Sequence, residues 1–258
     1  MKLYILILLI LILIIILKKR KEYFTNTEYW KTHDSNFLKY SNLKYFNREI
    51  KDISLKDENM FLANLLLKSP RNSYFLDVGA YNGDTCIEIS KFLKSKKRGD
   101  INIIGFEPKK NLCDKINKKA KDDKLNLKCI SIVLSNRKGS IFNKKEEGSG
   151  NMFNQKFKGN KFNSDLLDNQ LNELGIKNVF LLKIDVEGHE NEVLQGSKNI
   201  LNNTKHIYIE MWNDEHIKDR QGIENGSHNK NILYNLSNFY PIQKLEKNIY
   251  FKHKDLLK

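Results

Sequence analysis

The sequence predicts an α/β fold: a mostly parallel sheet with an antiparallel C-terminal strand and helices on both faces, preceded by an N-terminal transmembrane helix. From residue 57 onward, short apolar runs that end in a glycine or an acid alternate with segments carrying a helical apolar stripe. Such alternation is typical of a parallel sheet wrapped by helices. The last two apolar runs, within 239–253, are close enough in sequence to form an antiparallel hairpin.

Each element is expected from its local pattern. The strands are expected at 73–79, 101–108, 126–135, 178–188 and 205–212. The helices are expected at 57–68, 83–97, 109–121, 164–175 and 190–201. Pro108 ends the second strand and favours a helix start, and Gly175 is a natural helix end. Ligands of such sheets bind at the carboxyl ends of the strands, so those ends are the places to search for a site.

Residues 3–17 form an uninterrupted apolar run between Lys2 and the basic cluster at 18–21. As a helix the run spans roughly 22 Å, and flanking lysines can snorkel to complete a membrane crossing. Because a basic cluster follows where a cleavage site would have small residues, we predict an uncleaved anchor.

This interpretation predicts a single-pass membrane protein. Its parts are an anchor at 1–21, a stalk or N-terminal subdomain at 22–56, and the α/β domain at 57–258. The excess of basic residues on the C-terminal flank favours a cytoplasmic α/β domain, and the opposite topology stays open.

Composition gives weaker signals. The chain has 45 Lys and Arg against 31 Asp and Glu, a net charge of +14. The lysines are scattered and form no basic stripe interleaved with aromatic residues, which argues against a nucleic-acid partner. Three dispersed cysteines lack any C-x-x-C spacing, so we expect buried free thiols.

The end of the first strand has the form expected of a ligand-binding loop, Asp77-Val78-Gly79-Ala80-Tyr81-Asn82-Gly83-Asp84-Thr85. The two glycines allow a sharp turn and a close approach of a ligand to the backbone. The loop fits no phosphate-binding fingerprint, and its two acids suit a cationic or amine-bearing ligand. A plain strand-to-helix turn is the alternative.

Acids also end the other strands. Glu107 lies at the end of the second strand, where a carboxylate can accept hydrogen bonds from both ribose hydroxyls of a nucleoside. Lys183, Asp185 and Glu187 alternate at the end of the fourth strand, so they share one face. Such charge is costly to bury unless it is paired or serves a site, and a structural ion pair is the alternative. Glu210 ends the fifth strand.

Several segments, in order and spacing, resemble the FkbM family of S-adenosylmethionine-dependent methyltransferases. They are FLDVGAYNGDT, GFEPKKNL, IVLSNRKGSI, LLKIDVEGHENEVLQGSKNIL and IYIEMW. The likeness covers roughly residues 57–215, and KIDVEGHE is its most specific part. Tyr81 replaces the middle glycine of the general methyltransferase loop, a variation that resembles one branch of the family.

The resemblance implies a Rossmann-like class I methyltransferase that uses S-adenosylmethionine. Carried over, the methionine part of the cofactor would contact Asp77, Gly79, Ala80, Tyr81, Asn82, Gly83, Asp84 and Thr85. The ribose would contact Glu107, followed by Pro108, and the adenine would lie near Ser135. The acidic loop agrees with the positive charge of the cofactor's amino and sulfonium groups.

The resemblance also implies O-methylation of a hydroxyl on a glycan or another hydroxylated small molecule. A sugar hydroxyl must lose its proton, so a nearby base would help. The candidate catalytic residues are Asp185, Glu187, His189 and Glu210. His189 is equally consistent with a polar cap of the next helix. Asp185 and Glu210 could instead hold a divalent cation, although no metal site is argued.

Two other functions stay open. One is methylation of ribose hydroxyls in nucleic acid, suggested by the net charge. The other is a membrane-tethered binding module that kept the fold and lost the chemistry. The acids at the strand ends count against the binding module, because they are costly without a ligand.

Overall fold

The structure, a computed structural model, describes residues 49–50, 55–143, 153–154, 158–211, 227–245 and 248–257. Within these ranges no helix is both long and apolar enough to cross a membrane. The proposed anchor and almost all of the proposed stalk lie outside the described residues, so those two expectations stay predictions.

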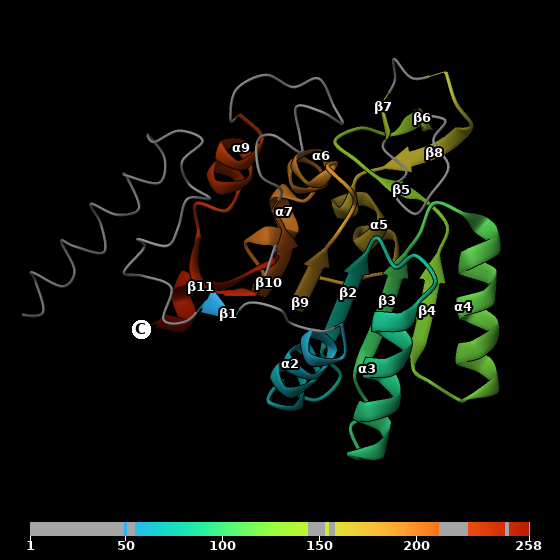
Figure 1. The fold of residues 1–258 in the computed structure, drawn as a ribbon, viewed down its shortest axis with the longest axis vertical. Coiled ribbons are helices and arrows are strands. Elements are labelled where there is room, and N and C mark those ends of the chain that lie inside the picture. Colours follow the sequence, from blue (N-terminus) through green and yellow to red (C-terminus); the bar gives the residue numbers. More distant parts are fainter. Residues whose placement is uncertain are drawn as a thin grey trace, which may run out of the picture.

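The chain alternates strands and helices along most of its described length (Figure 1). The first half contains β1 (Glu49–Ile50), α2 (Leu55–Leu67), β2 (Tyr74–Val78), α3 (Asp84–Ser95), β3 (Asn102–Phe106), α4 (Lys110–Asp122), β4 (Leu127–Ile130) and β5 (Val133–Leu134). An insertion and the next helix follow as β6 (Gly139–Asn143), β7 (Phe153–Asn154), β8 (Lys161–Asp165) and α5 (Leu167–Glu173). The rest contains β9 (Val179–Ile184), α6 (Glu190–Gln195), α7 (Lys198–Leu201), β10 (Thr204–Glu210), α9 (Ser227–Asn235), β11 (Phe239–Leu245), β12 (Asn248–His253) and the 3₁₀ turn η3 (Lys254–Leu257).

The main sheet has eight strands in the order β1-β11-β12-β10-β9-β2-β3-β4. Strands β10, β9, β2, β3 and β4 run parallel to one another, whereas β12 runs antiparallel to both β10 and β11. This confirms the mostly parallel sheet and its antiparallel C-terminal hairpin. After β2 the chain adds β3 and β4 on one side and returns to add β9 and β10 on the other. The strand order therefore switches between β2 and β9, the place where such sheets bind ligands.

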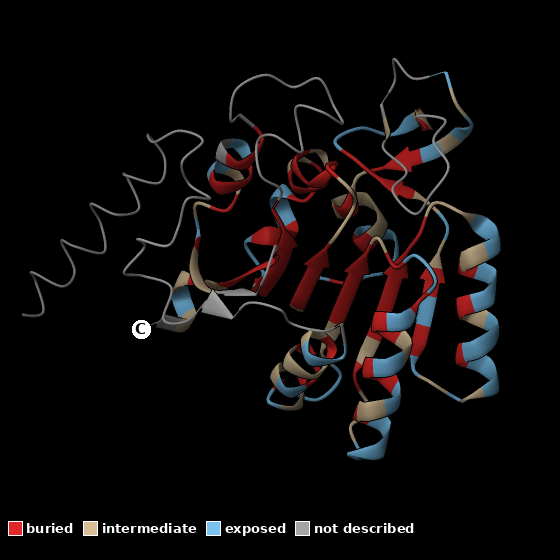
Figure 2. Cartoon of the chain, in the orientation of Figure 1, coloured by how far each residue is buried: buried red, intermediate tan, exposed pale blue. Residues whose placement is uncertain are grey.

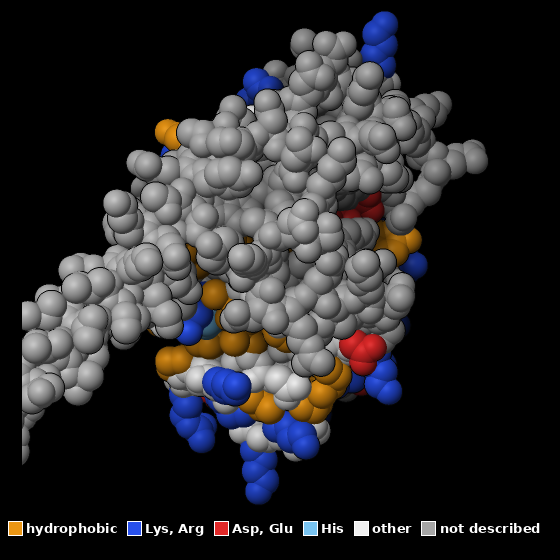
Figure 3. All heavy atoms as spheres, turned by 60° about the vertical axis from the view of Figure 1, so that its left-hand side comes forward, with side chains coloured by type: hydrophobic (Ala, Val, Ile, Leu, Met, Phe, Trp, Pro, Cys, Tyr) orange, Lys and Arg blue, Asp and Glu red, His pale blue; other side chains and the backbone are white. Residues whose placement is uncertain are grey.

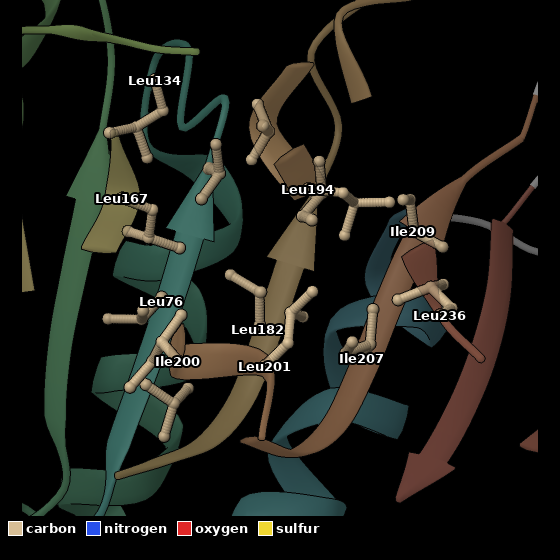
Figure 4. Close-up of a cluster of buried hydrophobic side chains, with 14 of the residues drawn as sticks. Leu76, Leu134, Leu167, Leu182, Leu194, Ile200, Leu201, Ile207, Ile209 and Leu236 are labelled. Carbon is tan, nitrogen blue, oxygen red and sulfur yellow. The ribbon is translucent and has the colours of Figure 1, made fainter. Parts of the chain in front are cut away.

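Two apolar layers hold the helices against the sheet. On one face α2, α3 and α4 pack through Leu62, Ile89 and Ile116 onto sheet residues such as Phe75. On the other face α5, α6, α7 and α9 pack onto alternate residues of the same strands (Figure 4). The central strands are buried along their length (Figure 2), as expected of a parallel sheet covered on both sides. Cys86, Cys113 and Cys129 are buried and free, as predicted.

The segment 126–135 was expected to be one strand, and this expectation is wrong. β4 ends at Ile130, and β5 leaves the main sheet to join a second sheet in the order β5-β8-β6-β7. Its partner β8 occupies the start of the segment expected to be the helix 164–175, so α5 begins only at Leu167.

The helix expected at 190–201 is divided into α6 and α7 at Gly196. A Cβ at Gly196 would lie 2.1 Å from the carbonyl oxygen of Ser135. The close approach of these two backbones therefore requires glycine where the helix breaks.

Candidate active site

A cavity of about 310 Å³ lies at the carboxyl edge of the main sheet, at the switch in strand order. Its size is at the lower end of the range for small-molecule sites. Residues following β2, β3 and β9 line it together with the segment that enters β5. Seven of the predicted site residues line the cavity, namely Gly79, Tyr81, Glu107, Pro108, Asp185, Glu187 and His189.

The loop after β2 is held in contact with the neighbouring strand ends. The N–H groups of Gly79 and Ala80 donate to the carbonyl oxygen of Phe106 at 3.0 and 3.1 Å. Gly79 has φ +89°, and a Cβ there would lie 1.8 Å from the carbonyl oxygen of Asp185. The glycine is thus required by the close packing of the two loops that border the cavity.

Glu107 is fixed at the edge of the cavity by backbone groups. Its Oε2 accepts the N–H of Tyr81 at 3.0 Å, and its Oε1 accepts the N–H of Lys109 at 2.9 Å. Burial raises the pKa of Glu107, and these two hydrogen bonds offset part of that shift. Each carboxylate oxygen retains a lone pair, so Glu107 can still accept the hydroxyls of a ribose.

One side of the cavity is apolar. Phe106, Ile132, Val133 and Leu134 line it next to Pro108, and Phe153 of β7 belongs to the same lining. The Phe153 ring lies edge-on to Phe162, with centroids 5.2 Å apart. An apolar slot of this kind suits a flat heteroaromatic ring such as adenine.

A buried ion-pair row runs beside the cavity. Lys183 Nζ lies 3.4 Å from Asp77 Oδ1 and 3.2 Å from Asp185 Oδ2. Burial alone would lower the pKa of Lys183, but the two carboxylates outweigh it and raise the pKa. Burial raises the pKa of Asp77, which the ammonium of Lys183 partly opposes. Asp77 is fully buried behind the cavity, whereas Asp185 is part-exposed and lines it.

His189 is buried in the cavity wall. Its Nε2 is 3.0 Å from Ser135 Oγ, and its Nδ1 is 3.7 Å from Glu192 Oε2. Burial lowers the pKa of His189 despite the nearby carboxylate of Glu192. Ser135 itself is buried and contacts His189, while its neighbours Val133 and Leu134 line the cavity.

Other predicted site residues lie outside the cavity lining. Asn82 and Asp84 are exposed and bond to each other, with Asn82 Nδ2 donating to Asp84 Oδ2 at 2.7 Å. Ala80 and Thr85 are buried, Thr85 within α3. Gly83, at φ +88°, precedes α3 and would place a Cβ 2.6 Å from the Ile116 side chain.

Glu210 is buried at the end of β10, opposite Asn248 of β12. Among the described residues no group of three or more His, Cys, Asp or Glu side chains is arranged to hold a metal ion.

Sequence reasoning missed most of the apolar wall. Lys109 directly follows the strand predicted at 101–108, and Val133 and Leu134 lie in the last residues of the strand predicted at 126–135, so all three could have been found by inspecting the strand ends. Phe153 belongs to the inserted second sheet, for which the apolar periodicity of the sequence gave no signal.

The cavity fits S-adenosylmethionine. Its lining has an apolar slot for the adenine, Glu107 beside it for the ribose, and two further carboxylates, Asp185 and Glu187, toward which a sulfonium and an amino group would be attracted. The glycine cradle at Gly79 brings the β2 and β9 loops together at this point.

Comparison with solved structures returns methyltransferases. An O-methyltransferase from Bacillus cereus in complex with SAH is 12% identical, with a TM-score of 0.44 over 78% of this chain and 81% of that chain. The SAH-bound Podospora anserina methyltransferase PaMTH1 is 10% identical, with a TM-score of 0.48 over 79% of this chain and 80% of that chain. The plantazolicin methyltransferase BpumL in complex with SAH is 14% identical, with a TM-score of 0.36 over 69% of this chain. The present chain spans about half of that last protein, 55%.

The comparison with curated proteins found no match. The sequence model of the methyltransferase FkbM domain matches residues 77–222, which is more than half of the chain. The matched range contains every strand end that lines the cavity, and the fold is the Rossmann-like fold of class I methyltransferases. The cofactor of this protein is S-adenosylmethionine. The chain belongs to the FkbM family of methyltransferases.

Proposed function

We propose that this methyltransferase transfers a methyl group to a hydroxyl oxygen of a glycan or another hydroxylated small molecule. The observation that carries the proposal is the Asp185 carboxylate, which lines the cavity with 31% of its side chain exposed while Lys183 bonds its Oδ2 at 3.2 Å. A carboxylate held in this way can take the proton that a hydroxyl must lose during methylation.

When bound, S-adenosylmethionine supplies a methyl group on a positively charged sulfur. Glu107 would bind its ribose, and the apolar slot beside Leu134 would hold its adenine. Asp185 would accept the proton that the acceptor hydroxyl loses when its oxygen takes the methyl group. Lys183 orients Asp185 through the 3.2 Å contact between its Nζ and Asp185 Oδ2. Much of the rate enhancement comes from holding the two reactants in line.

Asp185 is favoured over the other three candidate bases by its surroundings. The Nε2 of His189 is engaged by Ser135, and Glu210 is buried outside the cavity lining. Glu187 also lines the cavity and is the second candidate base. Its backbone has a positive φ of 55°.

We further propose that residues 3–17 anchor the enzyme to a membrane, with the α/β domain on the cytoplasmic side. The apolar run and the basic cluster at 18–21 support this location. Nucleic-acid methylation is less favoured. On the face drawn in Figure 3, the described lysine and arginine side chains stand apart, with hydrophobic and other side chains between them.

The experiment uses the full chain, methyl-labelled S-adenosylmethionine and a panel of glycans, small alcohols and RNA. We expect a labelled methyl ether on a hydroxylated small molecule or glycan. At saturating cofactor, Asp185→Asn should lose about 10²- to 10⁴-fold in kcat, and calorimetry measures separately how far the lost charge weakens cofactor binding. Methylation of a nitrogen, or a kcat unchanged in Asp185→Asn, would refute the proposal. Label found in RNA ribose alone would favour the nucleic-acid alternative.

A further inference from the structure

Glu190 is fully buried at the start of α6, behind the cavity. Its Oε1 accepts two backbone hydrogen bonds, from the N–H of Val186 at 3.2 Å and from that of Gly188 at 3.0 Å. Its Oε2 lies 3.2 Å from His228 Nε2. One carboxylate thus joins the turn that follows β9 to a side chain of α9.

The turn bonded by Glu190 is strained. Glu187 has φ +55° and Gly188 has φ +95°, and a residue other than glycine persists there only where its surroundings hold it. The two N–H groups that Glu190 accepts belong to the residues on either side of Glu187. Val186 and Glu187 line the cavity beside Asp185. Glu190 therefore fixes the backbone that presents the proposed base.

His228 is held in one orientation by Asn191. Asn191 Nδ2 lies 3.0 Å from His228 Nδ1 and 3.0 Å from the carbonyl oxygen of His228. An amide nitrogen only donates, so Nδ1 is the acceptor and the ring proton is on Nε2. That proton points to Glu190. Both residues are buried, and α9 lies against α6 (Figure 1).

We propose that Glu190 and His228 are a pair of positioning residues that fixes the conformation of the turn from Asp185 to Gly188. The position of α9 then determines the orientation of the proposed base, Asp185. Neither residue lines the cavity. Their effect on catalysis rests on the proposed function, whereas their effect on the turn does not.

Two substitutions of one residue separate positioning from mere packing. In His228→Gln the amide nitrogen can reach the place of Nε2 and still donate to Glu190. In His228→Asn the shorter side chain reaches only the place of Nδ1, so the bond to Glu190 is lost. His206→Gln is the matched control. It removes a buried histidine whose Nδ1 contacts Tyr250 Oη at 2.7 Å, on the other face of the sheet.

The first readout is amide hydrogen exchange at Val186 and Gly188, measured by NMR on the full chain. We expect faster exchange at both amides in His228→Asn, and parent-like exchange in His228→Gln and His206→Gln. The second readout is steady-state methyl transfer. We expect kcat to fall about 10- to 100-fold in His228→Asn, to stay near the parent value in His228→Gln, and KM for the acceptor to change little.

Equal exchange and equal kcat in the Gln and Asn variants would overturn the inference. So would faster exchange at Val186 and Gly188 in His206→Gln, since that would indicate general loosening. If the parent enzyme methylates no acceptor oxygen, the proposed function fails, and the exchange readout alone then decides the inference.

Discussion

Lys183 and Asp185 lie on the same face of the sheet at the end of β9, with Nζ and Oδ2 3.2 Å apart. The same ammonium is 3.4 Å from Asp77 Oδ1 on the neighbouring strand β2. One buried cation therefore ties a structural carboxylate to one that lines the cavity. This arrangement combines the two alternatives that the sequence left open, a structural ion pair and a functional site.

Lys183→Met should be strongly destabilising. It leaves Asp77 buried without its cation, and losing one partner of a buried ion pair costs about 3–5 kcal/mol. Urea denaturation of the full chain measures the change. Lys110→Met is the control, since Lys110 is exposed and pairs with Asp114 at 2.8 Å on the surface of α4. Equal shifts of the two denaturation midpoints would contradict the expectation.

The strand ends could be predicted because burial leaves a clear pattern. Asp77 interrupts the apolar run of β2 one residue before that strand ends at Val78, and Asp185 directly follows the last residue of β9, Ile184, so both acids mark the edge of the sheet. The sequence could not show which of these acids reaches the cavity. That depends on the pleat of the strands and on the position of Lys183. The ammonium of Lys183 contacts both carboxylates, but the Asp77 side chain is buried and the Asp185 side chain is part-exposed.

The second sheet could not be predicted from the sequence, for a different reason. β5 and β7 have two residues each, too short for a period-2 pattern to appear. Ser135 and His189 come together only because β5 leaves the main sheet and approaches the start of α6. Their 3.0 Å contact joins residues that are 54 positions apart, and local propensity does not encode such a pairing.

Gly79→Ala should disrupt the cavity. The new Cβ would lie 1.8 Å from the Asp185 carbonyl oxygen, at φ +89°. Overpacking of about 1–3 kcal/mol and a left-handed backbone of about 1–2 kcal/mol add to roughly 2–5 kcal/mol of lost stability. Cofactor affinity should fall as the two loops separate. Gly99→Ala, where a Cβ meets nothing within 4 Å, should change neither the denaturation midpoint nor the calorimetric Kd. If Gly79→Ala changed neither the denaturation midpoint nor the Kd, the two loops would not be tightly packed.

Glu107→Gln should weaken cofactor binding and remove part of its pH dependence. A lost charge-assisted hydrogen bond costs about 1.5–3 kcal/mol, equal to roughly a 10- to 150-fold rise in Kd. Burial raises the pKa of Glu107 above its ordinary 4.5. The cofactor-free protein therefore gains stability from protonated Glu107 below pH 4.5, and loses it as pH rises through the folded-state pKa.

Cofactor affinity should change in the opposite direction over the same window, because the ribose hydroxyls donate to the ionised form of Glu107. Calorimetry from pH 4.5 to 7 should show Kd falling with pH in the parent and a flatter profile in Glu107→Gln. Parallel profiles would remove Glu107 from the ribose site.

The folded protein should lose stability in acid because His206 is buried in its neutral form. Burial, with Lys252 and Lys205 nearby, lowers the pKa of His206 from 6.5 to about 4. A histidine that is buried in its neutral form contributes stability above its unfolded pKa and loses that contribution as pH falls through the folded value. The window is therefore pH 6.5 to about 4, and the loss is at most about 3 kcal/mol at about 1.36 kcal/mol per pKa unit. His206→Gln cannot gain this proton, so its unfolding free energy should fall less over that range. Urea denaturation at stepped pH measures both proteins, and identical slopes would mean that His206 is already protonated in the folded state.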